Sequence, residues 1–113
     1  GSENIINFSK FSYTIGTTIA LASLAKMVIS PDTSLVHIAE SVGTKSFGIY
    51  GPFPGKIRLS TYKNSDWIDC ERSCGPCFKH GQNLCTNGSN GYPLCFDNIK
   101  YDETFEKIER QLA

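Results

Sequence analysis

Four polar side chains that could contact a phosphorylated ligand lie close together: Asp32, Thr33, Ser34 and His37. An apolar run, KMVIS, precedes them, and a second one, SFGIY, follows the segment PDTSLVHIAESVG. If both runs are strands and a helix joins them, these residues lie where a strand ends and a helix begins. The free N–H groups and dipole of a helix N-terminus favour phosphate. Ligands of open α/β sheets also bind outside the carboxyl ends of the strands. The pattern therefore predicts a turn suited to phosphate.

The same residues have a purely structural interpretation. Asp32 or Thr33 could simply cap the helix by accepting a backbone hydrogen bond. His37 lies nearly opposite the apolar stripe of the predicted helix and shares a face with Thr33 and Ser34. A core histidine would lie on that stripe, so His37 is either a ligand contact or a polar residue in solvent.

The second candidate for chemistry is a cluster of five cysteines between residues 70 and 95. Their spacing is Cys70-x3-Cys74-x2-Cys77-x7-Cys85-x9-Cys95. A C-x2-C turn presents two thiolates to one point, as in many tetrahedral zinc sites. We expect a structural zinc ion held by Cys74, Cys77, Cys85 and Cys95, with His80 or Cys70 as a possible replacement ligand. The alternatives are two disulfides with one free thiol, or reduced thiols packed as small apolar groups.

Two further pairs of side chains could contact a ligand. Trp67 and Tyr62 could stack against a sugar, but we expect them to be packed in the protein. Arg58 and Lys56 follow the loop GPFPG and could reach a phosphate, but we expect them to be solvated charges.

The elements that would position these residues follow from periodicity and turn signals. We expect helices over 15–26, from about 33 to 42 and over 102–112, and strands over 27–30, 47–50 and 66–69. Residues 4–8 could form another short strand, and 56–64 stay ambiguous. Alternating strands and helices with short connections predict an α/β fold with a Rossmann-like parallel sheet. Gly43 should end the second helix.

Helical spacing also predicts which side chains face the core. The stripe of the second helix consists of Leu35, Ile38, Ala39 and Val42, at i, i+3, i+4 and i+7. The last helix should point Phe105, Ile108 and Leu112 inward.

Length and charge limit the possible classes of protein. A chain of 113 residues is enough for one small domain. We divide it into an α/β part (3–69), a Cys-rich segment (70–98) and a C-terminal helix (99–113). Gly1-Ser2 resembles a cloning scar, so we expect an excised piece of a longer protein. The 11 basic and 11 acidic residues cancel, which argues against a nucleic-acid partner. No apolar run is long enough to span a membrane.

A family resemblance sharpens this interpretation. The run SLAKMVISPDTSLVHIAESVGTKSFGIYGP resembles the signature region of family 9 glycosyltransferases, the heptosyltransferase-like enzymes of lipopolysaccharide core assembly. The residues that match the family pattern are Asp32, Thr33, His37, Ala39, Gly51 and Pro52. The segment from Cys74 to Cys95 is also similar to a cysteine segment of many members. The resemblance covers roughly residues 13–113.

The resemblance implies a GT-B fold and a place in its C-terminal, donor-binding domain. It implies that Asp32 contacts the donor sugar, that backbone N–H groups of Thr33, Ser34 and Leu35 hold the diphosphate, and that His37 lines the pocket. Gly51 and Pro52 would complete the donor site. Ser34 stands where the family has glycine, which would narrow the pocket or change the donor preference.

The function implied is the donor side of a glycosyltransferase that moves a sugar, such as heptose, from a nucleotide-sugar to a glycan. The catalytic base and acceptor contacts would lie in an N-terminal domain outside this chain, so we expect the chain alone to be inactive. The expected location is the cytoplasm or the cytoplasmic side of the inner membrane. The alternative is a zinc-stabilised α/β interaction module without catalysis.

Overall fold

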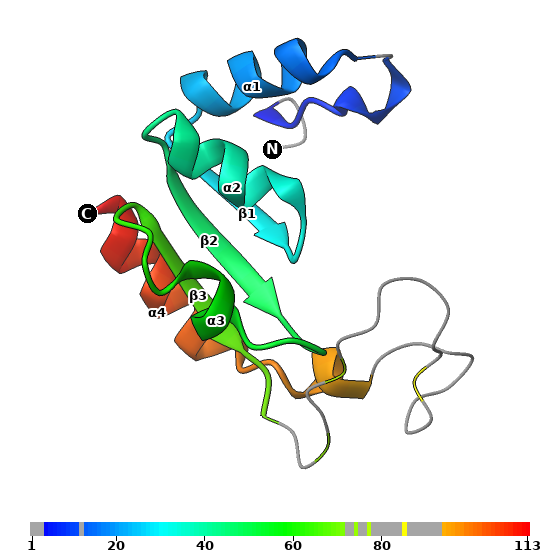
Figure 1. Cartoon of the computed structure of the whole chain (residues 1–113), viewed down its shortest axis with the longest axis vertical. Helices are drawn as coiled ribbons and strands as arrows, with labels where there is room; N and C mark the ends of the chain where they lie inside the picture. Colours follow the sequence, from blue (N-terminus) through cyan, green and yellow to red (C-terminus); the bar gives the residue numbers. More distant parts are fainter. Residues whose placement is uncertain (1–3, 12, 72–73, 75–76, 78–84, 86–93) are drawn as a thin grey trace.

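The structure is a computed structural model that describes residues 4–11, 13–71 and 94–113, together with Cys74, Cys77 and Cys85. Figure 1 shows the order of its elements along the chain. The helices are α1 (Ile15–Leu24), α2 (Ser34–Ser41), α3 (Gly55–Leu59) and α4 (Tyr101–Leu112), the strands β1 (Met27–Pro31), β2 (Lys45–Tyr50) and β3 (Ser65–Asp69), and the 3-10 turns η2 (Phe8–Lys10) and η3 (Leu94–Asn98).

The three strands form one parallel sheet in the order β1-β2-β3, with β2 in the centre. The register pairs Ile29 with Phe47, and Gly48 with Trp67. The predicted Rossmann-like α/β fold is confirmed. The expected strands and long helices all form, with bounds that differ by one or two residues. Gly43 has a φ of +76°, so it ends α2 in the left-handed conformation as predicted.

The predicted strand over residues 4–8 is wrong. Its residues join no strand, and the 3-10 turn η2 begins at Phe8. The Asn7 side chain accepts hydrogen bonds from the backbone N–H of Ser9 (2.9 Å) and from its hydroxyl (2.7 Å). Such local bonds offer the backbone a turn in place of a strand.

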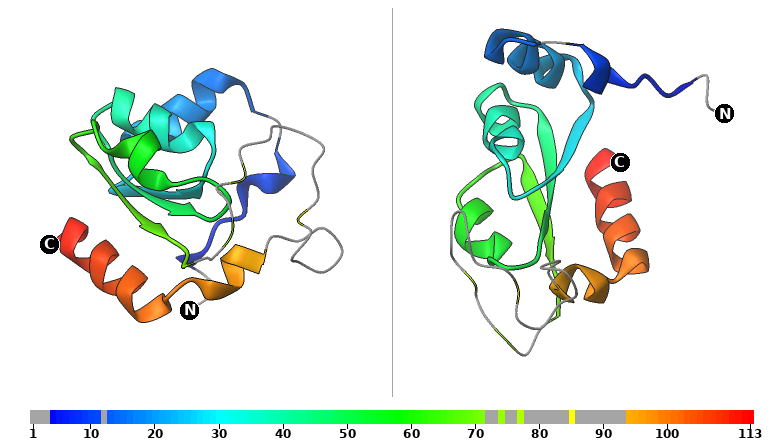
Figure 2. Two further views of the ribbon diagram at one scale, coloured as in Figure 1. Left: turned by 60° about the horizontal axis from the view of Figure 1, so that its bottom comes forward. Right: turned by 90° about the vertical axis from the view of Figure 1, so that its right-hand side faces the viewer.

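The two faces of the sheet are covered by different helices, as the two views of Figure 2 show. Helices α2 and α3 lie on one face, and α4 lies on the other. Under α2 and α3, Val36, Tyr50 and Leu59 form a fully buried cluster, against which Tyr62 and Trp67 pack. The expectation that these two aromatic residues are packed is therefore confirmed.

Helix α2 is buried over a wider arc than the predicted stripe. Ala39 is fully buried, whereas Leu35, Ile38 and Val42 are half-buried. Val36 lies outside the stripe and is also fully buried. Because α2 contacts α1 as well as β1 and β2, more than one side of the helix is covered.

The predicted inward face of α4 is wrong at two of three positions. Phe105 is 63% exposed and Leu112 is 51% exposed, whereas Ile108 is half-buried as predicted. The helix is rotated because polar side chains hold it to the sheet. Lys107 Nζ donates to Trp67 O (3.0 Å), and Gln111 Nε2 donates to Ser46 O (2.8 Å) and Asn64 O (3.2 Å).

Among the described residues, no helix has the length and apolar character needed to cross a membrane. Most of the Cys-rich segment, including His80, lies outside the described residues. The division of the chain at residues 69 and 98 stays a prediction.

Candidate functional site

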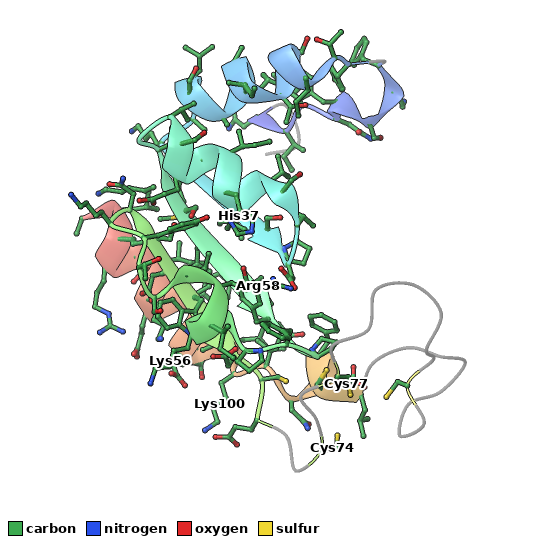
Figure 3. The ribbon with its side chains drawn as sticks, viewed as in Figure 1. His37, Lys56, Arg58, Cys74, Cys77 and Lys100 are labelled. Atoms are coloured by element: carbon green, nitrogen blue, oxygen red, sulfur yellow. The ribbon has the colours of Figure 1, made fainter. Side chains whose placement is uncertain are left out.

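The predicted site residues gather at the carboxyl ends of the strands. Asp32 and Thr33 follow β1, Gly51 and Pro52 follow β2, and Cys70 follows β3. Because the sheet is parallel, these ends lie at one edge, where Figure 3 also shows Arg58. The structure thus brings together the polar turn before α2, the Gly-Pro loop and the start of the Cys-rich segment.

Thr33 caps helix α2. Its backbone is extended (φ −136°, ψ 173°), and its Oγ1 accepts a hydrogen bond from the Leu35 N–H at 3.3 Å. The same hydroxyl lies 2.6 Å from Ser30 Oγ. The capping interpretation is therefore correct for Thr33, and the Leu35 N–H is engaged by the cap. Ser34 is the first helical residue and is exposed at the open end of α2.

Asp32 is paired with a cation from helix α3. Arg58 Nε lies 3.7 Å from Asp32 Oδ1, and the exposed fractions of the two side chains are 29% and 37%. The guanidinium carbon lies 4.4 Å from the centre of the Phe53 ring, a cation–π contact. The expectation of a solvated charge is wrong for Arg58, because Asp32 and Phe53 hold it at the strand ends. Lys56 is exposed, as expected.

His37 is neither in solvent nor at the mouth of α2. Its Nδ1 lies 2.6 Å from the hydroxyl of Tyr62, and the two rings meet edge to face with centres 5.6 Å apart. Both side chains are half-buried. Tyr62 belongs to the connection between α3 and β3, so the pair attaches α2 to that loop. The expectation of an exposed polar residue is wrong, because the sequence did not indicate this partner.

Tyr50, which sequence reasoning missed, lies at the end of the central strand. Its side chain is fully buried, and its hydroxyl has no hydrogen-bond partner within the described part of the chain. Burial raises the pKa of Tyr50 to about 12, and the charge of Asp32 adds to the rise while that of Arg58 opposes it. Its position as the last residue of β2 was the available signal.

Residues of the Cys-rich segment contact the Gly51-Pro52 loop. Cys70 Sγ contacts Gly51 O at 3.5 Å, and the Cys77 N–H donates to Pro52 O at 2.7 Å. A Cβ added to Gly51 would lie 2.9 Å from Cys95 Sγ. A glycine is needed here because the segment approaches the backbone so closely.

The predicted zinc site is not assembled by the described residues. Among them, no three His, Cys, Asp or Glu side chains are grouped to hold a metal ion. Cys74 and Cys77 are exposed, whereas Cys85 and Cys95 are half-buried. Figure 3 shows Cys74 and Cys77 at the same end of the sheet as the Gly-Pro loop. The zinc ion stays a prediction.

Fold and site together define a class of protein. A parallel α/β sheet carries a capped helix, a Gly-Pro loop and an acidic side chain at its carboxyl edge, which is where Rossmann-like proteins hold nucleotides. The family model for glycosyltransferase family 9 (heptosyltransferase) matches residues 13–86, well over half of the 113 residues. The chain belongs to this family. No curated protein and no solved structure matches it significantly.

Family membership confirms the resemblance seen in the sequence and supports a glycosyltransferase function. Family 9 enzymes have the GT-B fold, and the three-stranded parallel sheet fits a Rossmann-like part of it. The matched range contains the whole carboxyl edge of the sheet together with Cys74, Cys77 and Cys85. It ends before Cys95 and helix α4.

Proposed function

We propose that the carboxyl edge of the sheet binds the diphosphate of a nucleotide-sugar donor at the N-terminus of α2. The observation that carries this proposal is the placement of α2: an eight-residue helix begins directly after β1, inside the family range, with Asp32 and Thr33 at its mouth. The Ser34 N–H lies in its first turn, where the helix dipole favours an anion. The Leu35 N–H could join if Thr33 released it.

The proposed roles follow from the chemistry of each side chain. The Asp32 carboxylate accepts hydrogen bonds from donor sugar hydroxyls, and the helix N-terminus stabilises the diphosphate as it leaves. Gly51 and Pro52 form the adjacent wall of the site. His37 would line the pocket from the polar face of α2, behind the helix N-terminus, and its contact with Tyr62 would fix the position of its ring. Ser34 would narrow the pocket relative to glycine, so the sugar could be heptose or a smaller relative.

The reaction proposed for the enzyme is transfer of that sugar to a hydroxyl of a glycan of the lipopolysaccharide type. Such a transfer needs a base for the acceptor hydroxyl, and a base typically contributes about 10²–10⁴-fold in rate. The residues named above are proposed only to bind the donor. We therefore propose that a facing domain supplies it, as the family resemblance implies, and that residues 1–113 alone turn over no donor.

Amide shifts test the donor site. Nucleoside diphosphates and inorganic diphosphate are titrated into ¹⁵N-labelled protein up to millimolar concentration. We expect the amides of residues 32–35 to shift most. The N-terminus of α1 is the internal control, because Thr14 caps it through the Thr17 N–H but no strand end lies in front of it. Equal shifts at both helices, or none at residues 32–35, would show that the edge is not a diphosphate site.

Turnover tests the assignment of roles. The protein is incubated with a panel of nucleotide-sugars and acceptor glycans, and released nucleoside diphosphate is measured. We expect no release above background. Release that disappears in a His37→Ala variant would contradict the proposal, because it would place a complete active site in residues 1–113.

We also propose that Cys74, Cys77, Cys85 and Cys95 hold one structural zinc ion. The C-x2-C spacing of Cys74 and Cys77 supports this. Because the Cys77 N–H donates to Pro52 O, such an ion would also fix the segment beside the donor loop. Elemental analysis of protein purified without chelator tests it. One zinc per chain is expected, whereas no metal and a mass lower by two hydrogens per cysteine pair would show disulfides.

A further inference from the structure

We propose that Arg58 is a phosphate-binding residue of the donor site, and that it exchanges Asp32 for a phosphate oxygen when the donor binds. We further propose that the Tyr50 hydroxyl is the second side-chain donor at this place. The inference rests on the proposed function and deepens it, because it names the side chains that would recognise the diphosphate. Its subject is a specificity-determining contact, separate from the backbone N–H groups of α2.

The first observation is the geometry of the Arg58–Asp32 pair. The separation of 3.7 Å is longer than the 2.7–2.9 Å of a charge-assisted hydrogen bond. The pair is therefore an electrostatic contact that a phosphate oxygen could replace with a shorter one. Phe53 stacks on the guanidinium at 4.4 Å and so limits the positions it can take. A guanidinium held in this way pays little rotamer entropy to bind, and its planar fork matches phosphate.

The second observation is the Tyr50 hydroxyl. A fully buried hydroxyl that has no hydrogen-bond partner among the described residues is uncommon, and an unmade hydrogen bond lowers the stability of the fold. Tyr50 is the last residue of β2, at the strand ends where Asp32 follows β1, and the charges of both Asp32 and Arg58 act on its hydroxyl. An acceptor oxygen at this place would satisfy the hydroxyl. This is independent of the helix terminus, because Tyr50 belongs to the central strand.

Charge balance gives the pair its purpose. A carboxylate at the mouth of a diphosphate site repels the ligand, and the effect is strong where water is partly excluded. Arg58 offsets the charge of Asp32 while the site is empty. When a phosphate takes the guanidinium, Asp32 is released and can accept hydrogen bonds from sugar hydroxyls. The same exchange would therefore place Arg58 on the phosphate and free Asp32 for the sugar of the donor.

Lys56 provides a matched control on the same helix. It is a cation two residues before Arg58, and it is exposed. Figure 3 shows Arg58 at the carboxyl ends of β1 and β2, whereas Lys56 projects away from them on the other side of α3. Both residues are cations on the same helix, and replacing either one changes the net charge of the protein equally, but they lie at different places. A change in affinity at Arg58 alone cannot be a general electrostatic effect.

The experiment measures the Kd of inorganic diphosphate and of a nucleoside diphosphate for the 113-residue protein, four single variants and one double variant. Arg58→Met should weaken binding of both about tenfold, since a hydrogen bond to a charged group is lost. Lys56→Met should change the Kd by less than about twofold, as expected for a screened surface charge. Tyr50→Phe should weaken binding several-fold. Circular dichroism checks that each variant is folded.

For a fourth variant, Asp32→Asn, we expect tighter rather than weaker binding of diphosphate. Asp32→Asn removes the competing carboxylate and should tighten inorganic diphosphate binding, but only while Arg58 is present. In the Asp32→Asn/Arg58→Met double variant the gain should disappear, since the two residues act on each other. The Asp32→Asn variant keeps Arg58, so its tighter binding stays informative even if variants that carry Arg58→Met fold poorly.

The outcomes separate this inference from the proposed function. If the amides of residues 32–35 shift with diphosphate but folded Arg58→Met binds as tightly as the unmodified chain, the role of Arg58 is wrong and the donor site stands. Equal losses in Arg58→Met and Lys56→Met would also overturn it. No binding by the unmodified chain would overturn both. A loss confined to Arg58→Met, with tightening in Asp32→Asn, would support the exchange.

Discussion

The two faces of the sheet are covered in chemically different ways. On one face, Val36, Tyr50 and Leu59 are fully buried in an apolar cluster. On the other, α4 is held by side-chain hydrogen bonds from Lys107 and Gln111 to backbone carbonyls. Lys45 Nζ also donates to the Gln111 carbonyl. Helices α2 and α3, which carry residues of the candidate site, lie on the apolar face, so this cluster supports the elements that position the ligand contacts.

The two kinds of contact should contribute differently to the stability of the protein and to the attachment of α4 to the sheet. Burial of apolar side chains contributes in proportion to the area removed from water. A hydrogen bond contributes only about 1 kcal/mol net, because water bonds are exchanged for it. We therefore expect truncation of the apolar cluster under α2 and α3 to destabilise the whole protein, and loss of the Lys107 or Gln111 hydrogen bonds to loosen α4.

The largest effect is expected from truncating the apolar cluster. Leu59→Ala should lower the free energy of unfolding by about 2–5 kcal/mol, because it removes a fully buried side chain and leaves a cavity. The matched control is Leu112→Ala, the same change at a side chain that is 51% exposed, which should stay within about 0.5 kcal/mol. Urea denaturation followed by Trp67 fluorescence measures both. Equal losses would remove the distinction between the two faces.

A smaller effect is expected at the α4 interface. Gln111→Ala removes two hydrogen bonds to backbone carbonyls, which lowers stability. It also removes the buried Gln111 Oε1, which has no partner within the described residues, and this offsets part of the loss. The free energy of unfolding should therefore fall by about 1 kcal/mol. Hydrogen exchange should show faster opening of the α4 amides with little change in β2. Glu109→Ala, at an exposed position of the same helix, is the control. Faster exchange across the whole sheet would mean that α4 is part of the core.

The smallest effect at neutral pH is expected from Tyr50→Phe. The variant should stay within about 1 kcal/mol of the unmodified protein, because the hydroxyl has no hydrogen-bond partner to lose in the part of the chain that the structure describes. The difference should appear in alkali. The folded pKa of Tyr50 is raised from 10.0 to about 12, so its contribution is complete below pH 10 and is lost as the pH rises towards 12. Stability of the variant should fall less steeply over this range, and an identical slope would contradict the raised pKa.

The sequence predicted the elements whose signals are local. The strands around Ile29 and Phe47 showed as apolar runs, and Thr33 and Gly43 marked the two ends of α2. The family motif placed Asp32 at the edge of the sheet. These predictions needed no knowledge of distant partners.

The contacts that the sequence could not predict join distant segments. Arg58 meets Asp32 from a helix that the sequence left ambiguous, and His37 meets Tyr62 across 25 residues. The prediction of the orientation of α4 failed for another reason. Periodicity assumes that apolar side chains face the sheet, but Lys107 and Gln111 donate to backbone carbonyls of the sheet, so the inner face of α4 is shifted and leaves Phe105 and Leu112 exposed.

The order in which these contacts can form during synthesis follows from how far apart the contacting residues lie in the sequence. Paired strand residues such as Met27 and Lys45 are 18 positions apart, whereas Gln111 reaches Ser46 across 65. Alternation along the strands turns Phe47 and Ile68, both buried, towards the face that α4 covers. At 5–20 residues per second, α4 is completed roughly 2–9 s after β3. We expect that face to attract chaperones or neighbouring chains during this interval, and a chain ended at residue 98 should bind more of a hydrophobic dye than residues 1–113 do.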